Sequence, residues 1–322
     1  MRTIQALVTM AMAAALVAGC GGDGGGRTGP EESTGCAGGT LQSGDQTVTL
    51  QHGGLTREYL LHVPDAYDGA EPWPLVLNFH GFTSDATQQV AFSDMSATAD
   101  AEGFLVAYPQ GVLPPEGGPR SWNGGTCCGH AASEGIDDVG FARAVVDDVA
   151  ADGCVDLRRV FATGMSNGGY LSHRLACEAS DVFAAAGPVA GVLGIPAEEC
   201  TPERPVPLVH LHGTEDTLVP YEGGGAGGGE SVPDMMQGWA DRNGCAAEPS
   251  ESFQNGDAHC DTWSGCDDGV EVTLCTIEGM GHCWPGSELG VSICPSLGFG
   301  EGSLDISAND RMWELFAQFP MP

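Results

Sequence analysis

The chain has 322 residues and carries 44 acidic residues against 11 basic ones, which gives a formal net charge of −33 at pH 7. So large a negative charge repels phosphate backbones and excludes a nucleic-acid partner, and it is typical of a protein kept in solution by an acidic surface. Hydrophobic residues make up 42% of the chain, enough for the core of one large α/β domain.

The chain begins with a targeting segment. Residues 1–20 contain one arginine, an apolar run and small residues that end at Cys20, where LVAGC resembles a bacterial lipobox. We expect a lipoprotein signal peptide with an acylated Cys20, or a plain secretory signal cut near the same place. The run is too short for a lasting transmembrane helix, so membrane attachment is expected only through the N-terminal lipid. Residues 21–35 are glycine and polar residues that predict a flexible tether.

Strand and helix patterns alternate along the remaining residues, 36–322. Alternating apolar and polar residues around Gly53 and Gly54 predict an antiparallel hairpin. Short apolar runs typical of buried strands follow at 74–81, 103–109, 158–164, 183–191, 206–213 and 270–279. Helices are expected at 93–102, 137–152, 167–178, 231–242 and 308–319. This order predicts an α/β domain with a mainly parallel central sheet, in which sites gather at the C-terminal ends of the strands.

The cysteine count agrees with export. Of 13 cysteines, twelve remain if Cys20 carries lipid, and they could form up to six disulfides in an oxidising compartment. The sequence does not fix the pairing, and candidates with short separations are Cys177 with Cys200, Cys260 with Cys266 and Cys283 with Cys294. A zinc site at Cys127, Cys128 and His130 is an alternative, but adjacent cysteines lack the usual ligand spacing.

One acidic segment lies between cysteines near the end of the domain. Residues 255–271 lack the spacing of an EF-hand calcium loop. We expect a solvated hairpin stapled by disulfides, with calcium binding as the alternative.

A serine between glycines marks the candidate active site. GMSNG at 164–168 fits the G-x-S-x-G nucleophile elbow, with an apolar strand before it and a helix pattern after it. A serine nucleophile needs a histidine to take its proton and a carboxylate to orient that histidine. In the expected order, Ser166 is followed by Asp216 and then by His282, with Glu215 as the alternative acid. Other histidines are expected to be surface, packing or hydrogen-bonded structural residues: His52, His62, His173, His210 and His212.

Acyl transfer also requires N–H donors for the oxyanion. The candidates are the backbone groups of Asn167, which follows the serine, and of Phe82, which follows an early strand in HGFTSD. Trp122, Tyr221, Trp284 and Phe82 adjoin the motifs and are expected to line an acyl or aromatic pocket, although Trp122 and Trp284 equally suit a place in the core.

Six motifs in order resemble the esterase and polyhydroxybutyrate depolymerase family, which includes microbial feruloyl esterases. They are LNFHGF, SWNGGTCCG, GIDDVGFARAVVDDV, RRVFATGMSNGGYLSHRLAC, HGTEDTLVPYEGG and GMGHCWPG, and the resemblance runs from about residue 45 to the end. It implies an α/β-hydrolase fold, an exported serine esterase, no metal or organic cofactor, and a triad of Ser166, Asp216 and His282. Asp137 and Asp138 match its DDV segment, and on physical grounds they are expected to be a helix N-cap and a first-turn acid.

We therefore expect an exported serine esterase that hydrolyses polyhydroxybutyrate oligomers or feruloyl-type esters through an acyl-enzyme. The choice of an ester over a peptide rests on the resemblance, because a triad does not distinguish them. The alternatives are a lipase or peptidase of the same fold, and a catalytically silent surface lipoprotein that binds a partner. The sequence ends after its last predicted helix, so attack on bulk crystalline polymer is not expected, and no pattern fixes the oligomeric state.

Overall fold

The computed structural model describes residues 33–225 and 229–322. The predicted signal peptide, Cys20 and most of the predicted tether therefore lie outside the described residues. The end of that tether is different from expectation, because the Ser33 hydroxyl donates to the Gly153 carbonyl at 2.6 Å and accepts from the Val155 N–H at 2.8 Å. The folded domain thus begins at least three residues before residue 36.

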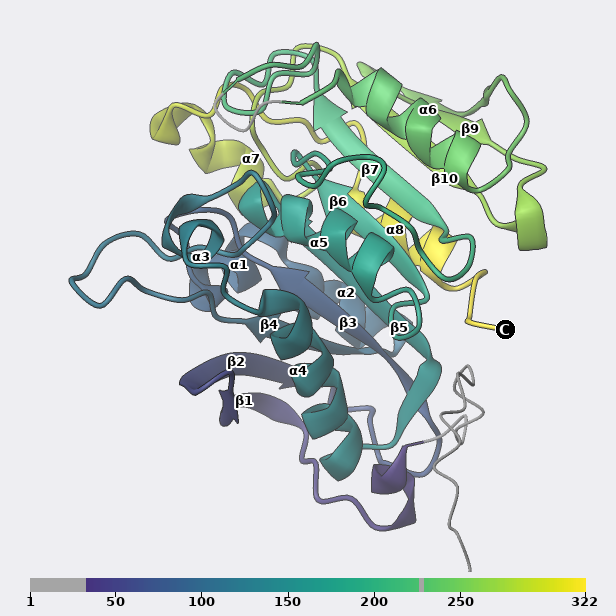
Figure 1. Cartoon of the computed structure of the whole chain (residues 1–322). Helices are drawn as coiled ribbons and strands as arrows, with labels where there is room; N and C mark the ends of the chain where they lie inside the picture. Colours follow the sequence, from purple (N-terminus) through teal and green to yellow (C-terminus); the bar gives the residue numbers. More distant parts are fainter. Residues whose placement is uncertain (1–32, 226–228) are drawn as a thin grey trace, which may run out of the picture.

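Ten strands form one mixed sheet, in the order β1-β2-β4-β3-β5-β6-β7-β10-β9-β8 (Figure 1). The strands are β1 Gly44–His52, β2 Leu55–Val63, β3 Trp73–Phe79, β4 Leu105–Pro109, β5 Val155–Met165, β6 Ala185–Val189, β7 Leu208–Gly213, β8 Ser250–Asn255, β9 Ala258–Trp263 and β10 Val272–Ile277. The middle of the sheet consists of six parallel strands, β4, β3, β5, β6, β7 and β10. An antiparallel pair flanks them on each side, β1 with β2 and β9 with β8. The expected parallel sheet is confirmed. So is the N-terminal hairpin, which turns through Gly53 and Gly54 at φ of 58° and 77°.

Helices cover both faces of this sheet (Figure 1). They are α1 Ala86–Ser93, α2 Met95–Glu102, α3 Gly129–Ser133, α4 Asp138–Asp152, α5 Asn167–Glu178, α6 Val232–Arg242, α7 Glu288–Ile293 and α8 Ala308–Phe316, with 3₁₀ turns at Thr34–Ala37, Asp267–Gly269 and Pro295–Leu297. Helices α1, α2 and α8 pack on one face, and α4, α5 and α6 pack on the other. None of the helices in the described part of the chain is long and apolar enough to cross a bilayer.

The core lies on both sides of the central strands, as their continuous apolar runs predict. Along β3, Val76 faces the side of α8, and its neighbours Leu75 and Leu77 face the side of α4. On the first side Phe161 stacks on Phe316, with their ring centroids 4.5 Å apart. Every residue of β4, β6 and β7 is buried. The sheet is therefore a rigid support for the loops at its strand ends.

Between β3 and β4 the helices differ from the sequence-based expectation. The helix expected at 93–102 is α2, which begins only at Met95, because Asp94 adopts a left-handed conformation with φ of 52° between α1 and α2. Helix α1 was not expected, since it has no continuous apolar stripe. It begins where the Asp85 carboxylate accepts the N–H of Gln88 at 2.9 Å.

Six disulfides join the twelve described cysteines: Cys36–Cys154, Cys127–Cys128, Cys177–Cys200, Cys245–Cys266, Cys260–Cys275 and Cys283–Cys294. The predicted pairs Cys177–Cys200 and Cys283–Cys294 are confirmed. The predicted pair Cys260–Cys266 is wrong, because Cys260 lies directly opposite Cys275 across the paired strands β9 and β10. The acidic segment contains β9, which pairs antiparallel with β8 on one side and with β10 on the other, and the disulfide Cys260–Cys275 staples β9 to β10.

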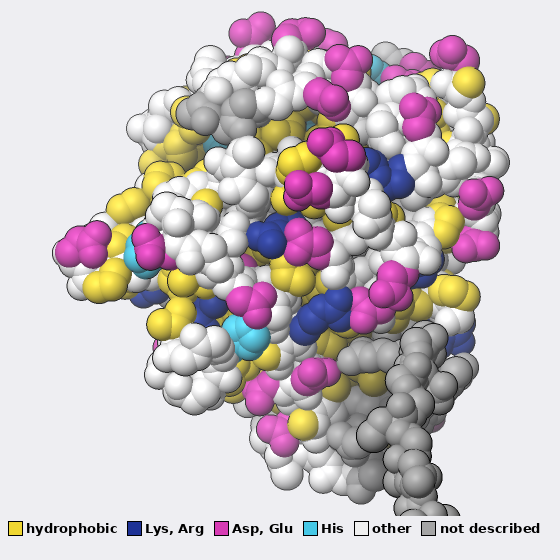
Figure 2. All heavy atoms as spheres, in the orientation of Figure 1, with side chains coloured by type: hydrophobic (Ala, Val, Ile, Leu, Met, Phe, Trp, Pro, Cys, Tyr) yellow, Lys and Arg dark blue, Asp and Glu magenta, His cyan; other side chains and the backbone are white. Residues whose placement is uncertain are grey.

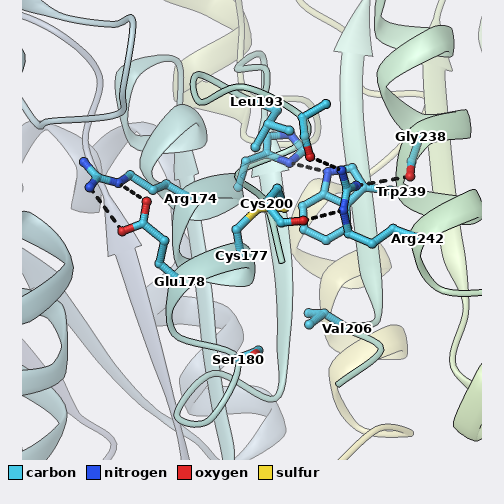
Figure 3. Close-up of a disulfide and its surroundings, with 12 residues drawn as sticks. Arg174, Cys177, Glu178, Ser180, Leu193, Cys200, Val206, Gly238, Trp239 and Arg242 are labelled. Carbon is cyan, nitrogen blue, oxygen red and sulfur yellow. Dashed lines mark hydrogen bonds and ion pairs between the residues drawn. A yellow bond between two sulfur atoms is a disulfide. The ribbon is translucent and has the colours of Figure 1, made fainter. Parts of the chain in front are cut away.

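The disulfide Cys177–Cys200 fastens the last turn of α5 to the segment that leads into β7 (Figure 3). Arg242 of α6 reinforces this junction by donating to the carbonyls of Cys200 at 2.9 Å and Gly238 at 3.1 Å. Acidic side chains are scattered over the visible surface around a smaller number of arginines (Figure 2). The net negative charge is therefore dispersed over this face and forms no single patch there.

The disulfide between Cys36 and Cys154 should contribute more to stability than the one between Cys245 and Cys266. The first spans 118 residues of sequence and the second spans 21. Because a longer closed loop removes more entropy from the unfolded chain, we expect losses of about 5 kcal/mol and about 3 kcal/mol in the two double Cys→Ala variants. Denaturant unfolding of both variants measures this difference, and a smaller loss for Cys36→Ala/Cys154→Ala would contradict the prediction.

Candidate active site

Ser166 lies in the turn that joins β5 to α5, where its backbone adopts φ of 55° and ψ of −121°. This region is unfavourable for a residue with a side chain, so the surroundings must hold the turn in place. The Ser166 N–H donates to the Val189 carbonyl at 2.8 Å, and the Ser166 carbonyl accepts from the N–H of Tyr170 at 2.9 Å. The sequence-predicted elbow is thus a strained strand-to-helix turn fixed by its neighbours.

The two flanking glycines are required by close backbone packing. A Cβ atom at Gly168 would lie 2.1 Å from the carbonyl oxygen of Phe79, and one at Gly164 would lie 2.6 Å from the same atom. No side chain fits at either position unless the end of β3 moves away. Helix α5 consequently starts directly against β3, and its first N–H groups, which have no partner within the helix, open beside Ser166.

Asp216 and His282 form a buried hydrogen-bonded pair. His282 Nδ1 lies 2.6 Å from Asp216 Oδ2, and Asp216 Oδ1 accepts from the backbone N–H groups of Leu218 and Val219, both at 2.8 Å. Burial alone would raise the pKa of Asp216. The hydrogen bonds from His212 and His282 outweigh it and hold this pKa well below its ordinary value. The acid is therefore an anion that can orient His282.

The alternative acid, Glu215, has an exposed side chain. It precedes Asp216 in the loop after β7, and it is Asp216 whose carboxylate meets His282. The fold thus separates two adjacent acids that the sequence alone could not separate.

Ser166 and His282 line one cavity of about 880 Å³. Its other walls are mainly apolar and come from the loop after β3, from α1, from α5 and from the segment around α7. The aromatic side chains among them are Phe82, Phe92, Tyr170 and Phe299. Phe299 lies edge-on to His282, with the ring centroids 5.7 Å apart. Sequence reasoning named Phe82 but missed the other three, although Tyr170 lies one helical turn after the serine.

The loop after β3 passes next to the serine. A Cβ atom at Gly81 would lie 3.4 Å from Ser166 Cβ, and the next residue is Phe82, which lines the cavity. Asn167 is the first residue of α5. The two backbone segments predicted to supply oxyanion donors therefore both lie next to Ser166.

Of the four residues predicted to line the pocket, only Phe82 is part of its wall, which corrects the expectation for Trp122, Tyr221 and Trp284. Trp122 is fully buried and donates to the His80 carbonyl at 2.9 Å. Trp284 is also fully buried, with its indole N–H 3.1 Å from Asn309 Oδ1. Tyr221 bonds through its hydroxyl to Thr276 Oγ1 at 2.7 Å. These side chains fix loops around the site, since each polar tip is used inside the protein.

The side chain of Asn167 ties the elbow to the loop that contains Trp122. Its amide oxygen accepts from the Trp122 N–H at 2.7 Å, and its amide nitrogen donates to the Trp122 carbonyl at 3.0 Å. The neighbouring Asn123 N–H donates to Asp138 at 2.7 Å. This loop is therefore held from two sides.

Asp138 is more than the first-turn acid that the sequence suggested. It is completely buried and pairs with Arg57 at 2.8 Å, while the Arg57 guanidinium lies 3.8 Å from the centroid of the Phe141 ring. Burial raises the pKa of Asp138, against the opposing effect of Arg57. Asp137 is the predicted N-cap, since its carboxylate accepts the Gly140 N–H at 2.8 Å.

Cys127 and Cys128, the core of the alternative zinc site, form a disulfide with each other and line the cavity. Within residues 33–225 and 229–322, no group of three or more His, Cys, Asp or Glu side chains is arranged to hold a metal ion.

Comparisons with known proteins agree with this geometry. Residues 57–200 match the family model described as esterase PHB depolymerase. The chain is 34% identical over 244 residues to feruloyl esterase B of Piromyces equi, covering 73% of this chain and 44% of that protein. It is 32% identical over 265 residues to the putative esterase NocK of Nocardia uniformis subsp. tsuyamanensis, covering 75% of each. The chain thus spans less than half the length of the first of these relatives.

Among solved structures, an acetyl xylan esterase from Aspergillus awamori superposes with a TM-score of 0.61 and 18% identity. The superposition covers 85% of this chain and 99% of that one, so the likeness extends over most of the fold. The predicted α/β-hydrolase fold is confirmed. Together with the identity to the Nocardia esterase, the family match shows that this chain belongs to the esterase and polyhydroxybutyrate depolymerase family.

Proposed function

We propose that this protein is an exported serine esterase that hydrolyses neutral carboxylic esters with an apolar acyl group. The observation that carries the proposal is that Ser166 and His282 open into one apolar cavity while His282 is held by a buried, ionised Asp216. A silent binding protein has no need of a strained serine or of this pair. The six disulfides support export, because such bonds persist in oxidising compartments. Acylation of Cys20 remains a prediction.

The reaction follows from the hydrogen bonds of His282. Because Nδ1 donates to Asp216, Nε2 is the nitrogen that can take the hydroxyl proton of Ser166. Ser166 Oγ attacks the ester carbonyl and forms a tetrahedral oxyanion. The bond to the alcohol then breaks, and the alcohol leaves with the proton from His282. Water attacks the acyl-enzyme in the same way, with His282 as base, and releases the acid.

The proposed oxyanion donors are the backbone N–H groups of Phe82 and Asn167. Asn167 supports this role as the first residue of α5, where the helix dipole also favours negative charge. For Phe82 the support is the close passage of its loop beside Ser166.

His80 holds the loop that carries Phe82. Its Nε2 accepts the Gly111 N–H at 3.0 Å, so the proton of the neutral ring is on Nδ1, which donates to the Gly81 carbonyl at 2.7 Å. Burial lowers the pKa of His80 to about 4. The ring therefore stays neutral at pH values well above 4.

The cavity supports a neutral, aromatic acyl group. Apart from His282, no described residue that lines it is acidic or basic, so a free carboxylate on the substrate would find no cationic partner. Four aromatic rings lie in the wall, and the volume is sufficient for a small organic ligand. One relative is named a feruloyl esterase. We therefore favour feruloyl-type esters over polyhydroxybutyrate oligomers, which end in a carboxylate.

Replacement of the nucleophile tests the mechanism. Ser166→Ala should abolish labelling by a fluorophosphonate probe and lower kcat by roughly 10⁴-fold to 10⁶-fold, because the acyl-enzyme cannot form. The exposed Ser250 on β8 provides the control, and Ser250→Ala should keep both labelling and activity. Absence of labelling in the folded wild-type protein would contradict the catalytic proposal.

Substrate choice tests the reading of the cavity. We expect kcat/KM for methyl ferulate to exceed that for 3-hydroxybutyrate oligomers by at least about tenfold. The loss of one apolar or hydrogen-bonding contact between substrate and pocket lowers kcat/KM by that amount or more. The same oligomers with their terminal carboxylate blocked as a methyl ester show whether the charge or the shape of the oligomer causes the difference in kcat/KM. If the free oligomers are hydrolysed faster than methyl ferulate, the enzyme is an oligomer hydrolase and the aromatic assignment is wrong.

The buried neutral His80 predicts a dependence of stability on pH. Its pKa in the folded protein, about 4, is below the unfolded value of about 6.5, so its contribution is complete above pH 6.5 and is lost as the pH falls toward 4. Within this window one such group changes the free energy of unfolding by about 1.4 kcal/mol per pH unit. Glutamine can accept the same N–H without titrating. His80→Gln should therefore reduce the slope measured by denaturant unfolding, and an unchanged slope would contradict the prediction.

A further inference from the structure

Three buried histidines form a row that leads from α5 to Asp216. His173 comes from α5, and His210 and His212 come from β7. All three side chains are completely buried, and none belongs to the wall of the cavity. The mechanism proposed above does not use them. Three imidazoles inside a core are expensive to bury, so each must have a hydrogen-bond partner.

The partners form one continuous chain. The indole N–H of Trp239 on α6 donates to His173 Nδ1 at 3.2 Å. His173 Nε2 lies 3.2 Å from His210 Nδ1, and His210 Nε2 lies 3.0 Å from His212 Nδ1. His212 Nε2 lies 2.8 Å from the Val219 carbonyl and 3.4 Å from Asp216 Oδ2. The row therefore connects α6, α5 and β7 to the loop that contains the acid.

The groups at the two ends of this row of hydrogen bonds fix the direction in which its N–H groups donate. An indole N–H can only donate, and a carbonyl or carboxylate oxygen can only accept. Each neutral imidazole between them has one donor and one acceptor. His173, His210 and His212 must therefore all carry their proton on Nε2, and all three N–H groups point toward Asp216. The two ends require this assignment independently, and they agree.

The same geometry excludes a charged imidazole within the chain. A second proton on His210, for example, would set two N–H groups against each other across a distance of 3.2 Å. Burial acts in the same sense, since it lowers the pKa of His173 to about 3 and that of His210 well below its ordinary value. The chain is a fixed array of neutral dipoles with its positive end at the acid.

We propose that His212, fixed in its tautomer by His210, His173 and Trp239, is the positioning residue that holds Asp216 and its loop in the geometry that His282 requires. This inference rests on the proposed serine esterase mechanism. The His212 N–H is closest to the Val219 carbonyl, and the Val219 N–H in turn donates to Asp216 Oδ1. One imidazole thus anchors the loop at residue 219 while it adds a weaker contact to Oδ2.

The far end of the chain is itself immobilised. Trp239 is fully buried, and the Arg242 guanidinium lies 4.9 Å from the centroid of its ring. Figure 3 places this arginine beside the tryptophan, next to the disulfide that closes the end of α5. The indole N–H of Trp239, which begins the row, therefore cannot turn away from His173, and this keeps the tautomers of the three histidines fixed.

Substitutions at His212 separate positioning from packing. His212→Gln keeps an N–H near the place of Nε2, whereas His212→Leu removes it at similar volume. With p-nitrophenyl acetate we expect the leucine variant to lose about 10-fold to 100-fold in kcat with KM changed less than about 2-fold, because a misplaced acid affects the reacting geometry rather than binding. The glutamine variant should recover most of kcat. His259→Leu on β9, a partly exposed histidine, is the matched control and should behave as wild type.

A ¹⁵N NMR measurement of the histidine rings tests the chain without any need for activity. At pH 5 to 8, His173 and His210 should be neutral, and the neutral form of all three rings should carry its proton on Nε2, in wild type and in Ser166→Ala alike. A neutral ring with its proton on Nδ1, or titration of His173 or His210 in this range, would overturn the proposal. So would a leucine variant with unchanged kcat, or a glutamine variant as slow as the leucine one.

The two readouts distinguish this inference from the proposed function. If the fluorophosphonate probe fails to label the protein while NMR finds the three Nε2 tautomers, the esterase proposal fails and the chain is a structural feature only. If labelling succeeds and the tautomers differ, the positioning role fails alone. If His212→Leu does not fold, the kcat of His212→Gln and the NMR spectrum of the wild type still test the proposal.

Discussion

The active site depends on one close contact between backbones, that of α5 with the end of β3. A Cβ atom at Gly168 would overlap the Phe79 carbonyl, so the helix can start against the strand only if glycine is present there. This contact has two results. It forces the turn that exposes Ser166 in a strained conformation, and it brings the loop after β3 next to that serine. The nucleophile and its proposed oxyanion donors are therefore positioned by the same packing.

Two buried carboxylates organise the loops around this contact, although the protein as a whole has a large excess of negative charge. Asp216 is surrounded by two backbone N–H groups and two imidazoles, and Asp138 by Arg57 and a backbone N–H. A buried carboxylate is tolerated only where donors compensate for lost hydration. In both places the donors belong to different segments of the chain. The acids therefore connect segments that are distant in the sequence.

The sequence allowed the elbow and the order of the triad to be predicted, because strand, turn chemistry and helix are local patterns that the chain displays directly. The walls of the cavity could not be predicted in this way. Trp122 and Trp284 adjoin the motifs, but the direction of a side chain depends on tertiary packing, and both rings point into the core. Phe92 was missed because α1 lacks an apolar stripe. The pairing of Cys260 with Cys275 depends on strand register, which short separation does not reveal.

The disulfide between Cys36 and Cys154 has a consequence for how the chain matures. Cys127 and Cys128 are made before Cys154, and Cys260 is made before Cys266, the true partner of Cys245. If Cys20 is acylated, oxidation of the other cysteines in order of synthesis would join Cys36 to Cys127 and Cys245 to Cys260. Native bonds then form only through exchange of these first pairs by attack of free thiolates. For oxidation in that order, the native pairing would require a disulfide isomerase as well as an oxidant.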